Sequence, residues 1–366
     1  MPELPFLKSL NLFSGLFSGF GSDGSAIGLS LGTTSVKLVE LKKAGKAWKL
    51  IHFAMAQLPD DVIVNREVVN SLRLVETIKS VTSQLKLSSK SVCTGMSGNS
   101  LMIKRMTLDI ASLKEADEQV AWEAEQYLPF DISEVVLDYQ ILSRSKEGKT
   151  DLILVAVKRS VLEGFMDSIE QSGLHPKIVD TDFFALQNLY ETNYSLHESE
   201  TVGIVDIGAS SIKLVALQAG VPIFTRDSGL GGRNLTVEIQ KSLNLSYEDA
   251  EALKIGGGSE SGTPQEVSDL IQAMSESIAN EIKKSIDFYN ASVGGGPFSA
   301  LFITGGSSQL PGLSNTIENI CTLPVQSFNP FNSIAYDPTV FTQDYLESIA
   351  PFAAVPLGLA IRAGIK

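Results

Sequence analysis

Residues 28–41 read GLSLGTTSVKLVEL, and residues 204–217 read IVDIGASSIKLVAL. Gly32 of the first stretch aligns with Gly208 of the second, and each stretch is an apolar strand, a turn rich in glycine and hydroxyls, and a second apolar strand. A hairpin of this kind directs backbone N–H groups and hydroxyls into its turn, where they can hold a phosphate. Two such hairpins far apart in one chain predict two related half-domains that face each other across a nucleotide.

Composition narrows the classes of function. The chain has 366 residues, which favours two domains, and its formal net charge is -13. The surplus of acidic side chains disfavours nucleic acid as a partner and disfavours purely electrostatic attachment to an anionic membrane. Cys93 and Cys321 lack a CxxC spacing and the three histidines are scattered, so neither a disulfide framework nor a zinc site is expected.

Residues 1–24 are interpreted as an apolar N-terminal tail. Its bulky side chains recur at helical spacing, although interspersed glycines and the GSDGS stretch weaken the helix: Phe6, Leu10, Phe13, Phe17 and Phe20. The segment is either flexible or packed on its own domain, or it is a docking element for a partner or a membrane interface. Lys8 is its only basic side chain, which weighs against lipid. The chain has no secretory signal pattern and no run of about 18 apolar residues that would predict a membrane span.

A third glycine motif follows an apolar strand near the C-terminal end of the chain. Residues 303–308 read ITGGSS, a strand that ends in Gly305 and Gly306 before a helix. These glycines let a flat base or a ribose lie against the backbone, and a helix N-terminus favours a nearby anion. Glu281 and Lys284 stand three residues apart on a predicted helix, a spacing whose simplest interpretation is a solvated ion pair.

Periodicity locates the remaining elements. An apolar stripe predicts a helix over residues 66–86. Residues 106–180 read as strand–helix–strand–strand–helix–strand, with a capping box at Ser112 and Glu115 and a hairpin around the polar turn SRSKEGKT. We interpret this segment as a small inserted α+β subdomain, a kind of insertion that often carries function.

These motifs resemble those of the actin-like ATPase superfamily. The resemblance rests on the two hairpins, the TGGSS turn and two helices rich in small residues, VDTDFFALQN and APFAAVPLGLA. The inserted sequence VAWEAEQYLPFDISEVVLDYQIL and the later EIKKSIDFYN are similar to the PilM family of type IV pilus assembly proteins, over residues 25–366. The implied fold class is α/β, with two duplicated actin-like lobes around a nucleotide cleft and a small inserted α+β subdomain.

The resemblance also implies a division of the chain. After the tail, the expected parts are a first lobe (25–105), the inserted subdomain (106–180), a connecting helix of the first lobe (181–198), a second-lobe core (199–232 and 297–344), a second-lobe outer subdomain (233–296) and a C-terminal helix that returns to the first lobe (345–366).

ATP and Mg²⁺ are the cofactors that the resemblance implies. The first hairpin contributes Gly32, Thr33 and Thr34 to the terminal phosphates, with Lys37 at the far end of that hairpin. The resemblance implies a second phosphate site at Asp206, Gly208, Ala209 and Ser210. It also implies that Gly305, Gly306 and Ser307 hold the adenosine, and that Glu281 and Lys284 flank the ribose and the base. Asp206 also approaches the hydration shell of the metal, and Asp182 stands where hydrolytic relatives place a water-orienting carboxylate or amide.

Ser30 departs from the family pattern. It stands where the second hairpin has Asp206 and where relatives usually have an aspartate that holds metal-bound water. A serine hydroxyl cannot replace that charge. Hydrolysis and Mg²⁺ affinity are therefore expected to be weak, whereas ATP binding by backbone amides and the adenosine turn is expected to remain.

The resemblance implies a cytoplasmic ATP-binding scaffold of the pilus inner-membrane platform. Its expected partner is the cytoplasmic N-terminal tail of a PilN-like protein, bound beside the inserted subdomain, with other platform or motor proteins as further partners and only indirect membrane association. The alternatives are an active actin-like ATPase or kinase, an FtsA-like protein, and a type II secretion scaffold. An FtsA-like protein is expected to carry a C-terminal membrane-targeting helix, and the secretion scaffold a membrane span.

Overall fold

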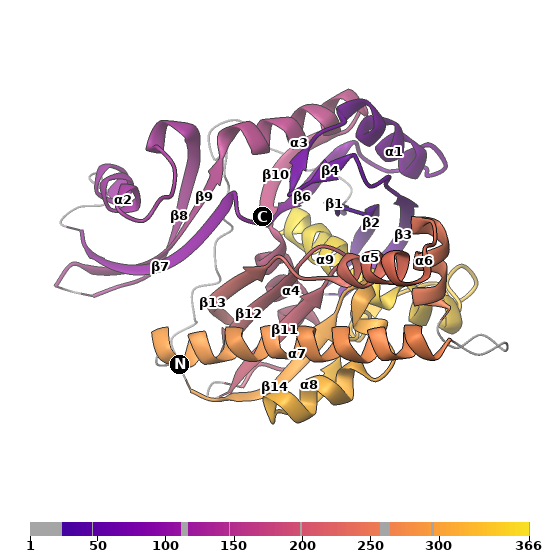
Figure 1. Cartoon of the computed structure of the whole chain (residues 1–366). Helices are drawn as coiled ribbons and strands as arrows, with labels where there is room; N and C mark the ends of the chain where they lie inside the picture. Colours follow the sequence, from indigo (N-terminus) through magenta and orange to yellow (C-terminus); the bar gives the residue numbers. More distant parts are fainter. Residues whose placement is uncertain are drawn as a thin grey trace. The chain divides into compact units, whose positions relative to one another are not determined.

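The computed structural model describes residues 24–45, 47–110, 116–145, 147–197, 200–256, 264–293 and 296–365. The expected N-terminal tail and the capping box at Ser112 and Glu115 lie outside these residues. The chain divides into two compact units, one made of Met1–Asn188 with Val355–Lys366 and the other of Leu189–Ala354 (Figure 1). Two helices rich in small residues, α4 (Asp182–Asn193) and α9 (Gln343–Gly364), contain the boundaries between the units.

The first unit is built on a sheet whose strands lie in the order β10-β6-β1-β2-β3. Their bounds are β1 Ser25–Leu31, β2 Ser35–Ala44, β3 Ala47–Gln57, β6 Ser91–Met96 and β10 His175–Thr181. Helices α1 (Ser71–Ser83) and α3 (Arg159–Gln171) bury apolar stripes against the strands. The helix predicted over residues 66–86 is therefore shorter than expected, because Ile63–Val64 (β4) and Glu67–Val68 (β5) form a tight hairpin in front of it.

The last turns of α9 pack against this sheet with almost no side chain between the backbones. A Cβ built on Gly28 of β1 lies 2.1 Å from the carbonyl oxygen of Pro356, and one built on Gly358 lies 1.8 Å from that of Ala185 in α4. Only glycine permits these approaches. By length and composition α9 resembles a membrane span, but 72% of its apolar window is buried inside the structure, as in the core helix of a soluble domain.

The inserted part of the first unit is a three-stranded sheet covered by one helix (Figure 1). Its strands lie in the order β7-β9-β8 and are all antiparallel: β7 Leu101–Asp109, β8 Val135–Arg144 and β9 Lys149–Lys158. A single-turn 3₁₀ helix, η1 (Ile132–Glu134), leads into β8. The β8–β9 hairpin is the one that the sequence predicts, and α2 (Ala116–Glu125) packs on the Leu152 and Leu154 face of β9.

The three-stranded sheet and its helix span residues 101–158, whereas the expected insertion was residues 106–180. Strand β10 pairs in parallel with β6 of the large sheet, and α3 packs in the same core as α1. The order of the elements is as predicted, but the last helix and strand belong to the main body of the unit. Local patterns identified these elements without revealing their distant partners.

The second unit is also built on a sheet, whose strands lie in the order β13-β12-β11-β14-β15. The strands are β11 Thr201–Ile207, β12 Ile212–Gln218, β13 Val221–Ser228, β14 Phe298–Thr304 and β15 Val325–Ser327. The short strand β16 is Ile334–Ala335. The helices are α5 Gly232–Leu243, α6 Tyr247–Ile255, α7 Gln265–Ser292 and α8 Leu313–Cys321, with the 3₁₀ helix η2 at Gly306–Gln309. A single apolar core joins the sheet to α5, α7 and α8.

Candidate functional site

Both predicted hairpins close with the same backbone contact. The Gly32 N–H donates to the Ser35 carbonyl at 3.0 Å, and the Gly208 N–H donates to the Ser211 carbonyl at 2.9 Å. In the ladders, Ser30 pairs with Lys37 and Asp206 pairs with Lys213. The duplication read from the sequence is therefore a duplication of three-dimensional structure, in register, one copy in each unit.

The two copies differ in the charge opposite the lysine. In the second hairpin, Lys213 Nζ lies 2.7 Å from Asp206 Oδ2, and the two side chains are only 8% and 10% exposed. In the first hairpin the residue facing Lys37 is Ser30, and a Cβ built on Gly32 comes within 3.7 Å of Lys37 Nζ. The Lys37 ammonium thus lies at the glycine turn, opposite a hydroxyl instead of a carboxylate.

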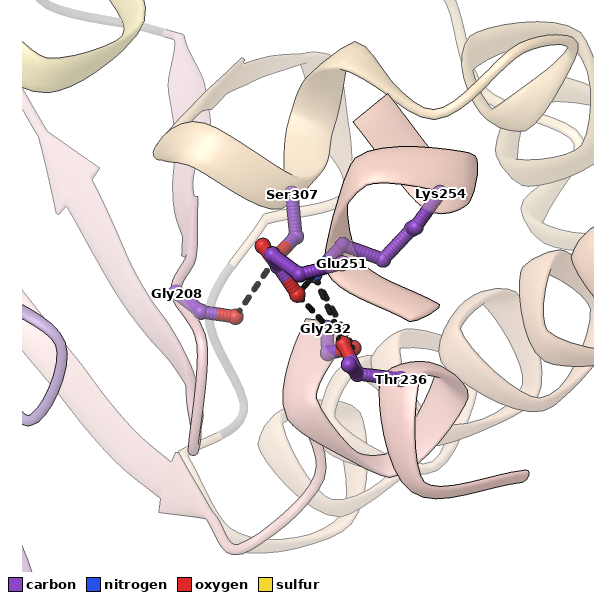
Figure 2. Close-up of polar contacts among 6 residues, drawn as sticks. All are labelled: Gly208, Gly232, Thr236, Glu251, Lys254 and Ser307. Carbon is purple, nitrogen blue, oxygen red and sulfur yellow. Dashed lines mark hydrogen bonds and ion pairs between the residues drawn. The ribbon is translucent and has the colours of Figure 1, made fainter. Parts of the chain in front are cut away.

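Three segments of the second unit converge on the second turn (Figure 2). The Ser307 hydroxyl donates to the Gly208 carbonyl at 2.9 Å, and the Gly232 N–H donates to the same oxygen at 3.0 Å. The first residue of α5 and the first turn of η2 are thereby fixed beside the hairpin. A Cβ on Gly232 would lie 2.2 Å from Ser307 Oγ, so the close approach requires glycine.

Helix α6 adds a charged pair to this cluster, which we call the α5–α6 cluster (Gly232, Thr236, Glu251 and Lys254). Lys254 Nζ lies 2.6 Å from Glu251 Oε2, 3.0 Å from Thr236 Oγ1 and 3.4 Å from the Gly232 carbonyl oxygen. The lysine side chain is 11% exposed and the glutamate 30%. Figure 2 shows the lysine and the glutamate above the start of α5, close to Ser307.

The sequence analysis missed Glu251 and Lys254, although the signal was present. The spacing Glu-x-x-Lys occurs in α6 at Glu251 and again in α7 at Glu281. The α7 pair lies elsewhere: Lys284 Nζ is 3.3 Å from Glu281 and 69% exposed, and Arg226 of β13 is 3.9 Å from Glu281. These contacts tie Glu281 both to Lys284 and to Arg226 of β13.

The TGGSS turn is shaped by its own packing. Gly305 has φ +90, and a Cβ on it would lie 2.4 Å from Asp206 Oδ1. A Cβ on Gly306 would lie 2.7 Å from the ring of Phe352. A bulky residue at position 306 would therefore disturb the fold before it met any nucleotide, and substitution there is a poor test of binding.

Asp182 is held firmly at the start of α4. Its Oδ2 accepts a hydrogen bond from the Ser97 hydroxyl at 2.8 Å, and Ser97 in turn accepts one from Arg66. A Cβ on Gly95 would lie 2.4 Å from Asp182 Oδ1. The side chain is 8% exposed, so the structure defines its position as that of a buried, hydrogen-bonded carboxylate.

Two other carboxyl groups of the first unit have a raised pKa because they are buried. Burial raises the pKa of Asp180 to about 6, although Arg362 at 3.5 Å favours the charged form. Burial likewise raises the pKa of Asp138 on β8 to about 6, against the opposing effect of the Tyr139 N–H. Both groups bind protons more tightly in the folded chain than in the unfolded chain.

We expect Asp138→Asn to stabilise the protein at neutral pH and to have less effect in acid. The wild-type folded state retains the Asp138 proton up to about pH 6, whereas the unfolded state releases it near its ordinary value of 3.8. The free energy of unfolding of the wild type therefore falls as the pH rises from about 4 to about 6. The variant has no proton to lose at this position, so its stability does not fall for this reason. The difference in unfolding free energy, on the order of 1 kcal/mol for a half-buried group, should grow between pH 4 and 6 and then level off. Urea titrations across this range measure it, and a difference that is constant with pH would contradict the expectation.

Comparison with known proteins identifies relatives over nearly the whole chain. The family model described as type IV pilus assembly protein PilM matches residues 28–364. A solved PilM–PilN type IV pilus biogenesis complex is 28% identical, with a TM-score of 0.83, and the match covers 93% of this chain and 99% of that one. The cell division protein FtsA of Bacillus subtilis is 21% identical over 86% of this chain and 81% of its own length.

Two more distant structures share the fold. The ethanolamine utilization protein EutJ of Carboxydothermus hydrogenoformans has a TM-score of 0.57 at 16% identity, covering 92% of this chain and 89% of its own. MreB 5 of Spiroplasma citri, solved with AMPPNP, has a TM-score of 0.50 at 12% identity, and the match covers 90% of this chain and 99% of that one. Together with the PilM complex, these structures show that the chain has the predicted α/β actin-like ATPase fold.

Proposed function

The chain belongs to the family of the type IV pilus assembly protein PilM, and on that premise we propose that it is a cytoplasmic, ATP-binding scaffold of the pilus inner-membrane platform. In this role it binds the cytoplasmic N-terminal tail of a PilN-like protein, turns ATP over slowly or not at all, and is peripheral to the membrane. The observation that supports ATP binding is that the glycine turns of the two hairpins close with the same backbone hydrogen bond.

ATP would be held by backbone groups and a few side chains. In the second unit, the turn at Gly208, Ala209 and Ser210 lies beside the N-terminus of α5, the end of the helix dipole that favours a phosphate. The N–H groups of Gly208, Gly232 and Arg233 already donate to backbone carbonyls of this region and hold the turn and the helix together. Gly305, Gly306 and Ser307 supply the flat surface for the adenosine. Lys254 and Glu251 replace Lys284 and Glu281 in our assignment of the pair beside the ribose, because they are the pair that contacts Gly232.

In the first unit, Thr33 and Thr34 offer hydroxyls at the turn, and Lys37 offers a positive charge. We infer that Lys37 binds the terminal phosphate. A lysine ammonium is a compact charge that suits phosphate oxygens. The ladder partner of Lys37 is Ser30, whereas the ladder partner of Lys213 is Asp206.

Mg²⁺ fits this donor set poorly. Asp206 is already engaged by Lys213, and Ser30 supplies no carboxylate. Across the part of the chain that the structure describes, no group of three or more His, Cys, Asp or Glu side chains is arranged to hold a metal ion. A magnesium ion would depend on the ATP phosphates and water for its ligands.

The proposal that a PilN-like tail is the partner rests on the family and on an apolar surface beside the insertion. The solved relative is a complex of PilM with PilN, which motivates a PilN-like tail as the ligand. In this chain, the β9 face opposite α2 carries Ile153 and Val155, which pack with Phe184 of α4. Leu101, Ile103 and Leu142 border this cluster and are only partly buried. An extended peptide can bury apolar side chains there or add to an edge strand of the three-stranded sheet.

We expect Ile103→Asp to weaken binding of a PilN-like tail peptide at least about tenfold, because the charge would have to be buried against the peptide's apolar side chains. Titration calorimetry with the intact protein measures the affinity. Trp122→Ser is the matched control, since Trp122 lies on α2 beyond the other face of the sheet and is 64% exposed. Equal affinities for both variants, with unchanged thermal unfolding, would place the partner site elsewhere.

A further inference from the structure

One row of residues crosses the three strands of the insertion on the side of its sheet opposite α2. Ile103 of β7 pairs with Val155 of β9, and Val155 pairs with Asp138 of β8. Directly paired residues of an antiparallel sheet lie on the same face, with neighbouring strands about 4.8 Å apart. Asp138 therefore lies on the face where Val155 packs with Phe184, in the same row as the partly buried Ile103. This is the face on which we place the tail of a PilN-like protein.

Within the part of the chain that the structure describes, the carboxyl group of Asp138 has a hydrogen-bond donor for one of its two oxygens. Oδ1 accepts a hydrogen bond from the Tyr139 N–H at 2.9 Å, and Oδ2 is buried without a donor. Buried acceptors in native proteins nearly always have a donor, because leaving one unpaired destabilises the fold. The exception at Oδ2 calls for a donor from outside the chain, either water or a ligand.

The charged groups around Asp138 leave its negative charge poorly compensated. Burial is the main cause that raises the pKa of Asp138 to about 6, and the negative charge of Asp117 on α2 raises it further. The Tyr139 N–H and the positive charge of Arg362 on α9 oppose this shift. However, Arg362 Nε lies 3.5 Å from Asp180 Oδ2, and both of these side chains are almost fully buried. Asp138 and Asp180 thus share one guanidinium, and an additional cation beside Asp138 would be stabilised.

A second pair of charges lies toward the β7 side of the same face and is already compensated. Arg105 of β7 pairs with Ile153 of β9 in the ladder, and its guanidinium binds both carboxylate oxygens of Asp151. The shortest of these contacts, from Nη2 to Oδ2, is 2.6 Å. A positively charged ligand gains little from a carboxylate that an arginine holds with two nitrogens. Asp138 is therefore the better acceptor for such a ligand.

The proposed partner carries positive charge for a general reason. Cytoplasmic segments that flank a membrane span are enriched in lysine and arginine, and the proposed ligand is the cytoplasmic tail of an inner-membrane protein. The net charge of -13 on this chain attracts a basic tail and accelerates its association. An extended tail that packs apolar side chains on Ile103 and Val155 also brings its basic side chains to the row that contains Asp138.

We propose that Asp138 is the specificity-determining residue of the partner surface and binds one lysine or arginine side chain of the tail. This inference rests on the proposed function, because it names the chemistry that the same surface selects. The ammonium or guanidinium group donates to Oδ2, while the apolar side chains of the tail pack on the neighbouring Ile103 and Val155. A tail without the cation would bury the carboxylate further and leave Oδ2 unpaired, and selectivity arises from that cost.

The test is calorimetry of the intact protein with two synthetic peptides of a PilN-like tail. One peptide keeps its lysine and arginine side chains, and the other has each of them replaced by glutamine. The wild type should bind the basic peptide at least about tenfold more tightly than the glutamine peptide, the usual effect of a hydrogen bond between charged groups. In Asp138→Asn the ratio should fall to about twofold, since only long-range attraction remains.

Glu118→Gln is the matched control, because it removes one negative charge at an exposed position of α2, beyond the other face of the sheet. It should keep the ratio of the wild type. Thermal unfolding of both variants shows that they are folded, as we expect for Asp138→Asn from its effect on stability.

The dependence on pH gives a second measurement. The affinity of the wild type for the basic peptide should fall roughly five- to tenfold between pH 7 and pH 5, because Asp138 takes up a proton near pH 6 and then no longer attracts the cation. Asp138→Asn should lack most of this fall. Asp180 takes up a proton in the same range, and the remaining fall in Asp138→Asn measures its contribution.

The possible failures are distinguishable. If the wild type binds both peptides equally, or if Asp138→Asn keeps the full ratio, Asp138 does not select a cation and water is the donor to Oδ2. The tail would then still be the partner of this surface. If the wild type binds neither peptide, the partner assignment under the proposed function is wrong, and the role of Asp138 is wrong with it.

Discussion

Lys37→Ala is expected to lower the affinity for ATP by about ten- to a hundredfold, the usual effect of losing one hydrogen bond to a charged group. The reason is the difference between the two hairpins. Lys213 is neutralised by Asp206 at 2.7 Å, whereas the ladder partner of Lys37 is Ser30, and the Lys37 ammonium lies beside the Gly32 turn. Calorimetry with ATP, with and without Mg²⁺, measures the change. Lys37→Arg keeps the charge and should retain part of the affinity.

Ser30→Asp sharpens this prediction because it restores the residue that the second hairpin has. Side chains directly opposite on an antiparallel pair lie about 5 Å apart, so the new carboxylate should pair with Lys37 as Asp206 pairs with Lys213. Without Mg²⁺, the variant should bind ATP about tenfold more weakly, because the carboxylate competes with the phosphate for Lys37. With Mg²⁺, the carboxylate can hold metal-bound water, so affinity should recover and any turnover should rise.

Ser30→Asn is the control for Ser30→Asp, since it has a similar size and no charge. It should leave the dependence of ATP affinity on Mg²⁺ close to that of the wild type. A wild-type protein that binds ATP only with Mg²⁺, or that shows robust multiple turnover, would contradict the assignment of the phosphate charge to Lys37. The same result would favour an active ATPase over a scaffold.

The sequence predicted the structure best where an element is defined by a short local pattern. The two hairpins were evident because a strand, a glycine turn and a strand occupy consecutive residues, and the paired turns closed by Gly32 and Gly208 follow from that pattern. The hairpin of β8 and β9 was predicted for the same reason. In each of these elements, the contacts that define the structure join residues close in the sequence.

Prediction was weaker where partners are far apart in the chain. Strand β10 looked like part of the insertion, but its hydrogen bonds go to β6, which begins at Ser91. The spacing Glu-x-x-Lys occurs in both α6 and α7, and spacing alone could not show that Lys254 is the lysine that contacts Gly232. The need for glycine at position 306 comes from Phe352, a contact that no local pattern reveals.

Lys213→Ala is expected to lower the free energy of unfolding by about 3–5 kcal/mol, because it leaves the Asp206 carboxylate buried without its partner. The pair lies in the central strands of the second unit's sheet, and both side chains are nearly inaccessible to water. The Asp206 carboxylate is also packed closely against the backbone of Gly305, since a Cβ built on that glycine would lie 2.4 Å from Asp206 Oδ1. Urea unfolding followed by circular dichroism measures the loss.

Two further variants decide whether this loss comes from the unpaired charge. Lys241→Ala removes a lysine from an exposed pair with Glu238, 67% and 52% exposed, and should cost less than about 0.5 kcal/mol. Lys213→Met combined with Asp206→Asn removes both charges at similar volume and should recover most of the stability lost in Lys213→Ala, since a buried ion pair is roughly equivalent to well-packed neutral groups. If the double variant were as unstable as the single one, the ion pair itself would contribute stability that neutral groups of similar volume do not replace, and the unpaired Asp206 carboxylate would not be the source of the loss.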